Sequence, residues 1–252
     1  MANSTEQHEM WTRRAGSFGA HAADYERHRP DYPVAGIRWA LESAPPGGTL
    51  LDLGAGTGKL TGGLRAMGYR VIAVEPDADM RAELTAKYPD IPVYSGTAES
   101  IPLPDAVVDA VAVGQAFHWF DKARAFPEIA RILRPAGVLA ALWNDSDRTV
   151  DWVRDMERLA DEGEDPNPAV EDLPAHPFFP SSERRDFAHS QRRTADSLTA
   201  QLGTHSALLI LPEQERTEML RRVLTYLRGH PDTGAGEFEA PMLTTVIRAI
   251  RH

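Results

Sequence analysis

Three glycines at alternate positions form the most informative feature of this 252-residue chain. Residues 50–59 read Leu-Leu-Asp-Leu-Gly-Ala-Gly-Thr-Gly-Lys, so Gly54, Gly56 and Gly58 follow an apolar run. A loop without Cβ atoms lets backbone N–H groups approach a ligand closely. A dinucleotide-binding loop reads Gly-x-Gly-x-x-Gly, whose third glycine would fall on Lys59, and a P-loop requires Gly-Lys-Ser/Thr. The spacing therefore predicts a ligand-binding loop that matches neither pattern.

A carboxylate follows this loop at a distance typical of a ribose ligand. Glu75 lies 21 positions after Gly54, directly after the apolar run 70–74. In a doubly wound sheet the ends of neighbouring strands lie side by side, so Glu75 can accept hydrogen bonds from both hydroxyls of a ribose. An acidic residue after a strand is often only a turn or a cap, but the glycine spacing favours the ribose role. Met80 would face an adenine ring or pack in the core.

The elements that position these residues follow from alternating apolar runs and helical patterns, which predict a parallel sheet wrapped by helices. We expect strands at 50–53, 70–74, 92–94, 107–113 and 138–142, and helices at 60–67, 78–87 and 121–133. The last helix is the clearest, because Asp121 can cap it and apolar residues recur at helical spacing from Phe126. Arg134, Pro135 and Gly137 are expected to end it.

The pattern changes after Trp143, where acidic residues and prolines become frequent. A basic cluster follows, made of Arg184, Arg185, Arg192 and Arg193. We predict a solvated edge strand and helix start there, with an anion-contacting patch as the alternative. An amphipathic helix around 220–227, begun by Pro212, and a C-terminal strand at 242–250 complete the chain. Residues 145–236 are expected to fold over the sheet as an insertion rather than as an independent domain.

Composition argues against several classes of function. The formal net charge of −10 makes nucleic acid and anionic lipid poor partners. The absence of cysteine excludes disulfides, thiolate metal sites and cysteine nucleophiles, and fits a cytoplasmic location. The N-terminus is polar and no run approaches about 18 apolar residues, so we expect neither a signal peptide nor a membrane span.

Five segments, in order, resemble the class I S-adenosylmethionine-dependent methyltransferases, especially the small-molecule type 11 group. They are Leu51-Asp-Leu-Gly-Ala-Gly-Thr-Gly58, Val74-Glu-Pro76, Gly96-Thr-Ala-Glu-Ser-Ile-Pro102, Gln115-Ala-Phe-His-Trp-Phe-Asp121 and Ile132-Leu-Arg-Pro-Ala-Gly137. The resemblance implies an α/β fold with a doubly wound, seven-stranded, mostly parallel, Rossmann-like sheet. It also implies a single domain over 1–252, with a helical lid at 1–33, a cofactor-binding core at 34–144, a substrate cap at 145–236 and a last strand at 237–252.

The resemblance further implies which residues hold S-adenosylmethionine. The glycine loop would cradle the methionine part, Glu75 the ribose, and the loop 96–99 the adenine. The expected ligands are Tyr25, Arg29, Asp52, Gly54, Ala55, Gly56, Thr57, Gly58, Glu75, Pro76, Met80, Thr97, Ala98, Glu99 and Gln115. Many relatives have aspartate where this chain has Thr97, so Glu99 is an alternative ligand of the adenine amino group. Asp52 would contact the cofactor through water or tie down the glycine loop.

By the same resemblance, residues 115–121 border the transferred methyl group. His118 is the candidate base or acceptor-positioning group, and a ring fixed by a backbone hydrogen bond at a strand-to-helix turn is the alternative. His118, Trp119, Trp143 and Trp152 would line the substrate pocket, with Phe178 and Phe179 as further walls. In-line methyl transfer depends mainly on positioning and water exclusion, and it requires no metal. A carboxylate acceptor needs no base, whereas a hydroxyl or amine often does.

The expected function is methyl transfer to the carboxylate or hydroxyl of a small metabolite or natural product, with S-adenosylhomocysteine as the second product. Two other classes stay open at this point. An NAD(P)-dependent oxidoreductase shares the strand, loop and ribose acid, and a non-catalytic cofactor-binding subunit would bind the donor alone. The sequence leaves open the identity of the acceptor atom, the need for a base and the oligomeric state.

Overall fold

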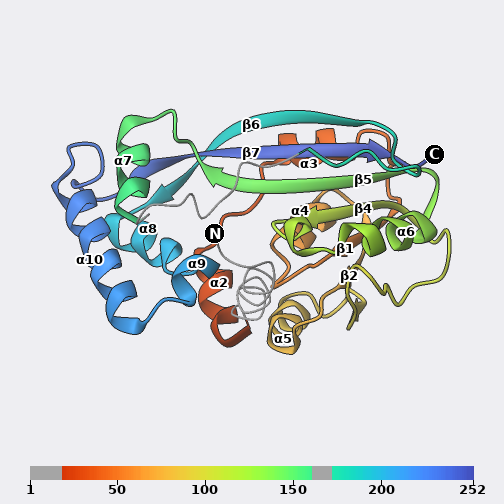
Figure 1. Ribbon diagram of the computed structural model, residues 1–252, viewed down its shortest axis with the longest axis horizontal. Helices are drawn as coiled ribbons and strands as arrows, with labels where there is room; N and C mark the ends of the chain where they lie inside the picture. Colours follow the sequence, from red (N-terminus) through yellow and green to blue (C-terminus); the bar gives the residue numbers. More distant parts are fainter. Residues whose placement is uncertain (1–18, 161–171) are drawn as a thin grey trace. The chain divides into compact units, whose positions relative to one another are not determined.

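The computed structural model describes residues 19–160 and 172–252 (Figure 1). Its elements, in chain order, are η1 (Gly19–His21), α2 (Ala22–His28), α3 (Val34–Ala40), β1 (Thr49–Leu53), α4 (Lys59–Ala66), β2 (Arg70–Val74), α5 (Ala78–Lys87), β3 (Val93–Tyr94), β4 (Val108–Gly114), η2 (Phe117–Trp119), α6 (Lys122–Ile132), β5 (Leu133–Ser146), α7 (Asp151–Ala160), β6 (Ser182–Arg193), α8 (Ala195–Leu202), α9 (Ser206–Leu209), α10 (Glu213–Gly229) and β7 (Phe238–Ile250). The predicted lid residues before Gly19 lie outside the described residues.

Seven strands form one sheet in the order β3-β2-β1-β4-β5-β7-β6. The pairs among β1 to β5 are parallel, and the arrow of β7 points opposite to that of β5 in Figure 1. This mixed, Rossmann-like sheet confirms the predicted α/β fold. Because β2 and β4 flank β1 on opposite sides, the connections after β1 and β4 diverge at the carboxyl edge of the sheet. Ligands bind at such switch points.

Two hydrophobic cores cover the sheet, one on each face. Successive residues of β1 point to opposite sides, so Leu51 packs in one core and Leu50 in the other. The first core contains Phe126 of α6, and the second contains Leu64 of α4. Helices on both faces hold the carboxyl ends of the central strands rigidly in place.

The predicted elements of this half agree closely with the structure, with one exception. The bounds of β2 and α5 match the prediction at both ends, and the Asp121 carboxylate caps α6 by accepting from the Ala123 N–H (3.1 Å). The predicted end of this helix lies within one residue of the observed end at Ile132. The exception is β5, which begins at Leu133 instead of Val138, so that Pro135 and Gly137 lie inside the strand. The β4–β5 register shifts between Leu133 and Val138, so the segment containing Pro135 is irregular and needs no ladder N–H.

The basic cluster lies on β6, the last strand of the sheet order, and this confirms the predicted solvated edge strand. Arg192 lies within 3.7 Å of Glu237, next to β7. Pro212 directly precedes α10, as predicted, and β7 begins four residues earlier than expected. No helix of the described residues is both long and apolar enough to cross a bilayer.

The chain groups into two compact units. Among the described residues, the glycine-loop unit contains 31–144, 172–187 and 244–252, and the helical unit contains 19–30, 145–160 and 188–243. Within the helical unit, α7, α8, α10 and β7 share a third core that includes Trp152, Val223 and Leu227. The boundary after Asn144 coincides with the predicted start of the insertion. The roles of lid and cap stay predictions.

Candidate functional site

All three glycines of the loop after β1 have a left-handed backbone, and Gly54 and Gly56 differ in their surroundings. Gly54 has φ +70° and Gly56 has φ +56°. A Cβ on Gly54 would lie 2.7 Å from the Ala116 Cβ, whereas a Cβ on Gly56 would meet none of the described residues within 4 Å. Gly54 is therefore required for packing against the turn after β4. Gly56 faces open space in which a ligand can approach the backbone.

Backbone hydrogen bonds fix this loop to the end of β2. The N–H groups of Gly54 and Ala55 both donate to the Val74 carbonyl (2.8 and 3.2 Å), and Gly58 donates to the Ala55 carbonyl (2.9 Å). The side chains of Ala55 and Thr57 are buried. These contacts therefore hold the backbone around Gly56 in a fixed position.

Glu75 closes the other side of this space, in direct contact with the loop. One carboxylate oxygen accepts from the Gly56 N–H (2.9 Å) and the other from the Asp77 N–H (2.9 Å). Only 7% of the residue is exposed, and this burial raises the pKa of its carboxyl although both N–H groups act to lower it. Each oxygen keeps a second lone pair, so the carboxylate can also accept from two ligand hydroxyls.

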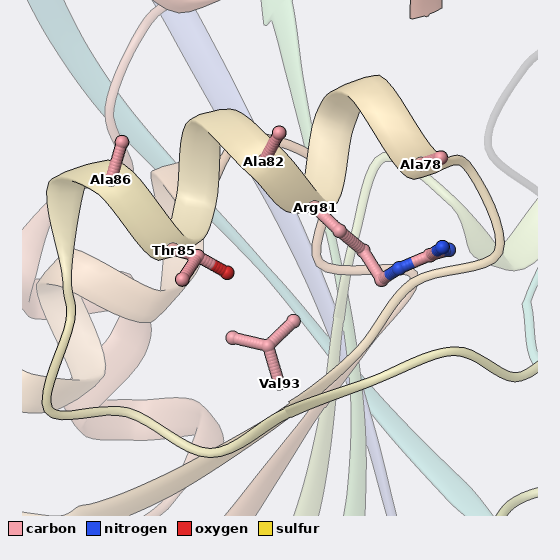
Figure 2. Close-up of a pocket in the computed structure, with 6 residues that line it drawn as sticks. All are labelled: Ala78, Arg81, Ala82, Thr85, Ala86 and Val93. Atoms are coloured by element: carbon pink, nitrogen blue, oxygen red, sulfur yellow. The ribbon is translucent and has the colours of Figure 1, made fainter.

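Arg81 holds the chain that bears Glu75. Its guanidinium donates to the carbonyls of Glu75 and Pro76 (2.9 and 2.6 Å). Figure 2 shows Arg81 extending from α5 beside a shallow hollow that is lined by Ala78, Arg81, Ala82, Thr85, Ala86 and Val93. Arg81 therefore fixes the turn after β2, which in turn orients the Glu75 carboxylate.

Asp52 is a second buried carboxylate, in β1. Its Oδ2 accepts from the Thr61 hydroxyl of α4 (2.5 Å), and its Oδ1 has no partner in the described part of the chain. Burial raises the pKa of Asp52 to about 7, although Thr61 acts to lower it. This contact ties β1 to α4 beside the glycine loop. The spare oxygen leaves capacity for one more donor, such as water.

The raised pKa predicts how stability depends on pH. An acid whose pKa is raised on folding binds more protons in the native state than in the unfolded state between its two pKa values. The ionisation of Asp52 therefore lowers the free energy of unfolding as the pH rises from about 4 to about 7. We expect Asp52→Asn to remove that loss, which is on the order of a few kcal/mol. In urea unfolding, the variant minus wild-type difference should grow with pH over this range; a constant difference contradicts the assignment.

The predicted adenine loop, residues 96–99, folds back on itself. The Ser100 N–H donates to the Thr97 carbonyl (3.2 Å), and the Thr97 side chain is exposed. Ala98 and Met80 are buried, each 3% exposed. The Glu99 carboxylate accepts from the Asp121 N–H (2.8 Å). Glu99 therefore contributes to the start of α6, and its role toward an adenine stays a prediction.

Gln115, directly after β4, has an unusual backbone. Its φ is +55°, although it is not glycine, and such strained residues cluster at functional sites. Its side chain donates to the Asn144 carbonyl (2.6 Å). Asn144, at the carboxyl end of β5, is buried and donates to the Asp31 carbonyl (3.2 Å). These contacts link the ends of β4 and β5 to the chain before α3.

His118 lies in η2 between two tryptophans. Its Nδ1 accepts from the Trp143 indole N–H (3.4 Å), and its ring lies 4.6 Å from that of Trp119. A neutral imidazole that accepts at Nδ1 has its proton on Nε2. This hydrogen bond orients the ring at the turn, but it comes from a side chain, whereas the predicted alternative named a backbone hydrogen bond.

The comparisons with known proteins agree with this architecture. The type 11 methyltransferase domain matches residues 51–141, the segment from the glycine loop to β5. An uncharacterized methyltransferase of Mycobacterium tuberculosis is 40% identical over 234 residues, which cover 92% of this chain and 95% of that protein. The chain belongs to the type 11 methyltransferase family. This confirms the resemblance seen in the sequence.

Two further relatives of this methyltransferase are informative. The solved structure of a putative type II methyltransferase from Anaeromyxobacter dehalogenans is 32% identical, with a TM-score of 0.64, and covers 88% of this chain and 96% of that one. A malonyl-[acyl-carrier protein] O-methyltransferase of Pectobacterium atrosepticum is 35% identical over 128 residues, which are 50% of this chain and 51% of that protein. The first covers nearly the whole fold, and the second covers half the chain.

Three of the predicted residues of the methyltransferase belong to the helical unit, namely Tyr25, Arg29 and Trp152. There the Arg29 guanidinium lies 5.2 Å from the Tyr25 ring centre and donates to the Thr204 carbonyl (3.0 Å). Their predicted roles toward cofactor and acceptor stay predictions.

The idea that Phe179 is a pocket wall was wrong. This side chain is 2% exposed and packs in the sheet core, with its ring centre 5.6 Å from that of Phe126 on α6. Phe178 is exposed. The Phe-Phe pair after Pro177 shows no alternation from which the buried member could be chosen, so only tertiary packing decides it.

Asn144, Thr61 and Arg81 were not predicted from the sequence. Asn144 had a usable signal, because it ends the apolar run of a parallel strand as Glu75 does. Thr61 and Arg81 lie on helix faces toward the glycine loop and the turn after β2. Their spacing gives no sign of these contacts, which depend on how the helices dock.

Proposed function

We propose that this methyltransferase binds S-adenosylmethionine at the carboxyl edge of β1, β2 and β4 and transfers its methyl group to a small-molecule acceptor. The observation behind this proposal is the buried Glu75 carboxylate bound to the N–H of Gly56, beside open space. Spare lone pairs on Glu75 match a ribose diol, and a Cβ-free loop matches close approach by the methionine part. The residues present therefore fit the donor.

The chain contributes binding and orientation to the reaction. The bound sulfonium supplies an already activated methyl group, so positioning of the acceptor provides most of the rate, on the order of 7–11 kcal/mol of barrier lowering. Glu75 holds the ribose, the glycine loop contacts the methionine part, and Gln115 fixes the turn after β4. Membership in the methyltransferase family argues against the nicotinamide-dependent oxidoreductase.

A carboxylate is the acceptor that these features favour. The Pectobacterium relative is named as an O-methyltransferase of a malonyl group, and an ionised carboxylate requires no base before it is methylated. The Nδ1 of His118 accepts a hydrogen bond from the Trp143 indole N–H. We propose that His118 positions the acceptor region rather than removing a proton.

His118→Asn tests this role. The Asn Oδ1 occupies nearly the place of the His Nδ1 and can keep the bond from Trp143, but it cannot act as a base near neutral pH. We expect kcat to fall less than about tenfold, with an unchanged pH profile, whereas loss of a general base reduces the rate by about 10²–10⁴. His118→Ala, which also removes the acceptor for Trp143, should be worse. A larger fall of kcat in His118→Asn, together with the loss of one ionisation from the pH profile, would show that His118 acts as a general base.

Labelled methyl transfer tests the proposed acceptor. The protein is incubated with S-adenosylmethionine labelled in the methyl group and a low-molecular-weight cell extract, and the products are treated with mild alkali. Methyl esters release volatile methanol, whereas methyl ethers and methylamines do not. We expect alkali-labile label. Alkali-stable label would contradict the carboxylate, and no transfer despite donor binding would favour the non-catalytic subunit.

A further inference from the structure

The helical unit contains a small pocket that the donor site does not use. It lies among the end of β5, α7, α8 and β7, and its walls include Trp152, Val153, Met156, Leu198, Gln201 and Met242. The pocket is small, with about 10 Å³ open to the centre of a water molecule. In this form the pocket has room for one water-sized group.

Gln201 is the polar feature that distinguishes this pocket from ordinary core. It lies on α8, only 7% of it is exposed, and its Oε1 has no hydrogen-bond partner within the described chain. A buried amide oxygen without a donor is unfavourable, so native proteins rarely keep one without a reason. A donor that enters the pocket would remove this penalty.

The other walls determine what kind of donor fits. None of the residues that line the pocket is charged, so an ionic group would lose its hydration there without gaining a counter-ion. Trp152 provides a broad apolar surface beside the pocket. Met156 and Met242 have flexible side chains that move aside at low energy, so the pocket can widen around a ligand.

We propose that this pocket binds an uncharged, mainly apolar group bearing one hydrogen-bond donor, a hydroxyl or an amide N–H, which donates to the Gln201 Oε1. The apolar body of the ligand packs on Trp152 and displaces the two methionine side chains. This inference does not depend on the bound methyl donor. In this proposal Trp152, which was expected from the sequence to line the substrate pocket, provides the apolar surface on which the ligand packs.

The test uses two probes of similar size, phenol and toluene, of which only phenol has a donor. The protein, labelled with ¹³C in the methyl groups of its seven methionines, is titrated to millimolar probe and followed by NMR. Met156→Leu and Met242→Leu assign the two pocket signals. We expect phenol to shift both signals saturably and toluene to bind about tenfold more weakly, because toluene leaves the Gln201 oxygen unpaired.

Gln201→Met removes the amide but keeps the length of the side chain, and it should abolish or reverse the preference for phenol. Gln214→Met makes the same change at an exposed position of α10 and should keep the preference. If Gln201→Met does not fold, the ratio of phenol to toluene in the wild type decides the question. Unchanged pocket signals would mean that the space holds only water. Equal binding of the two probes would remove Gln201 as the anchor, and either result overturns the proposal.

Discussion

Glu75→Gln is expected to weaken binding of S-adenosylhomocysteine by about one to two orders of magnitude, since hydrogen bonds to a charged group contribute about 1.5–3 kcal/mol. In the structure each carboxylate oxygen already accepts one backbone N–H, from Gly56 and from Asp77. An amide would turn an NH₂ group toward one of these donors, and it would lose the acceptor that a ribose hydroxyl requires. Titration calorimetry with S-adenosylhomocysteine measures the effect directly.

A matched control is available on the next helix. Glu83→Gln makes the same change in the middle of α5, outside the glycine loop and the turn after β2. It should bind S-adenosylhomocysteine as the wild type does. Equal affinity in Glu75→Gln and Glu83→Gln would remove Glu75 from the donor site, provided that both variants show a wild-type unfolding transition.

The second large effect is a difference between Gly54 and Gly56, because an added Cβ should lower stability at the first and ligand affinity at the second. Gly54→Ala adds a Cβ at 2.7 Å from the Ala116 Cβ, on a backbone with φ +70°. Left-handed strain costs about 1–2 kcal/mol and overpacking about 1–3 kcal/mol. For a protein of this size we expect the melting temperature to fall by roughly 5–15 °C. Gly54→Ala is thus mainly a stability variant.

Gly56→Ala should lose less stability than Gly54→Ala and should mainly lose affinity for S-adenosylhomocysteine. Its φ is +56° and no atom of the described part of the chain lies within 4 Å of the added Cβ, so we expect only the backbone strain of about 1–2 kcal/mol. The new methyl group enters the space assigned to the donor, and affinity for S-adenosylhomocysteine should fall at least about tenfold.

Gly68→Ala is the matched control for this variant, since Gly68 has φ +85°, an equally open surrounding and a place in the turn before β2. It should lose similar stability and keep its affinity. If Gly56→Ala binds the product as well as Gly68→Ala does, the open space at Gly56 is not the donor site.

The sequence predicted the glycine-loop half of the protein well because its signals are local. Apolar runs of strand length, punctuated by Gly54 and Glu75, are enough to place β1 and β2 and to bring these residues to one edge of a parallel sheet. The contact between Glu75 and Gly56 is the physical outcome of that register. The early start of β5 was missed because Pro135 and Gly137 were interpreted as a break between helix and strand, although an irregular strand also accommodates proline.

The helical unit was less predictable for physical reasons. Its helices α7, α8 and α10 bury their apolar faces against one another and β7. The amphipathic pattern of α10 was recognised, but which helix faces meet depends on long-range contacts that no single segment encodes. The capping box of Thr194 and Ser197 at the start of α8 was a usable local signal that was not used. The unpaired Gln201 oxygen could not be foreseen, because it depends on how the helices α7 and α8 pack against the strands β5 and β7.

The most direct test of the donor site compares two ligands in parallel calorimetric titrations of the full chain. We expect saturable, one-to-one binding of S-adenosylhomocysteine that is weakened in Glu75→Gln, and no binding of NADH under the same conditions. Tight binding of NADH with none of S-adenosylhomocysteine would contradict the account.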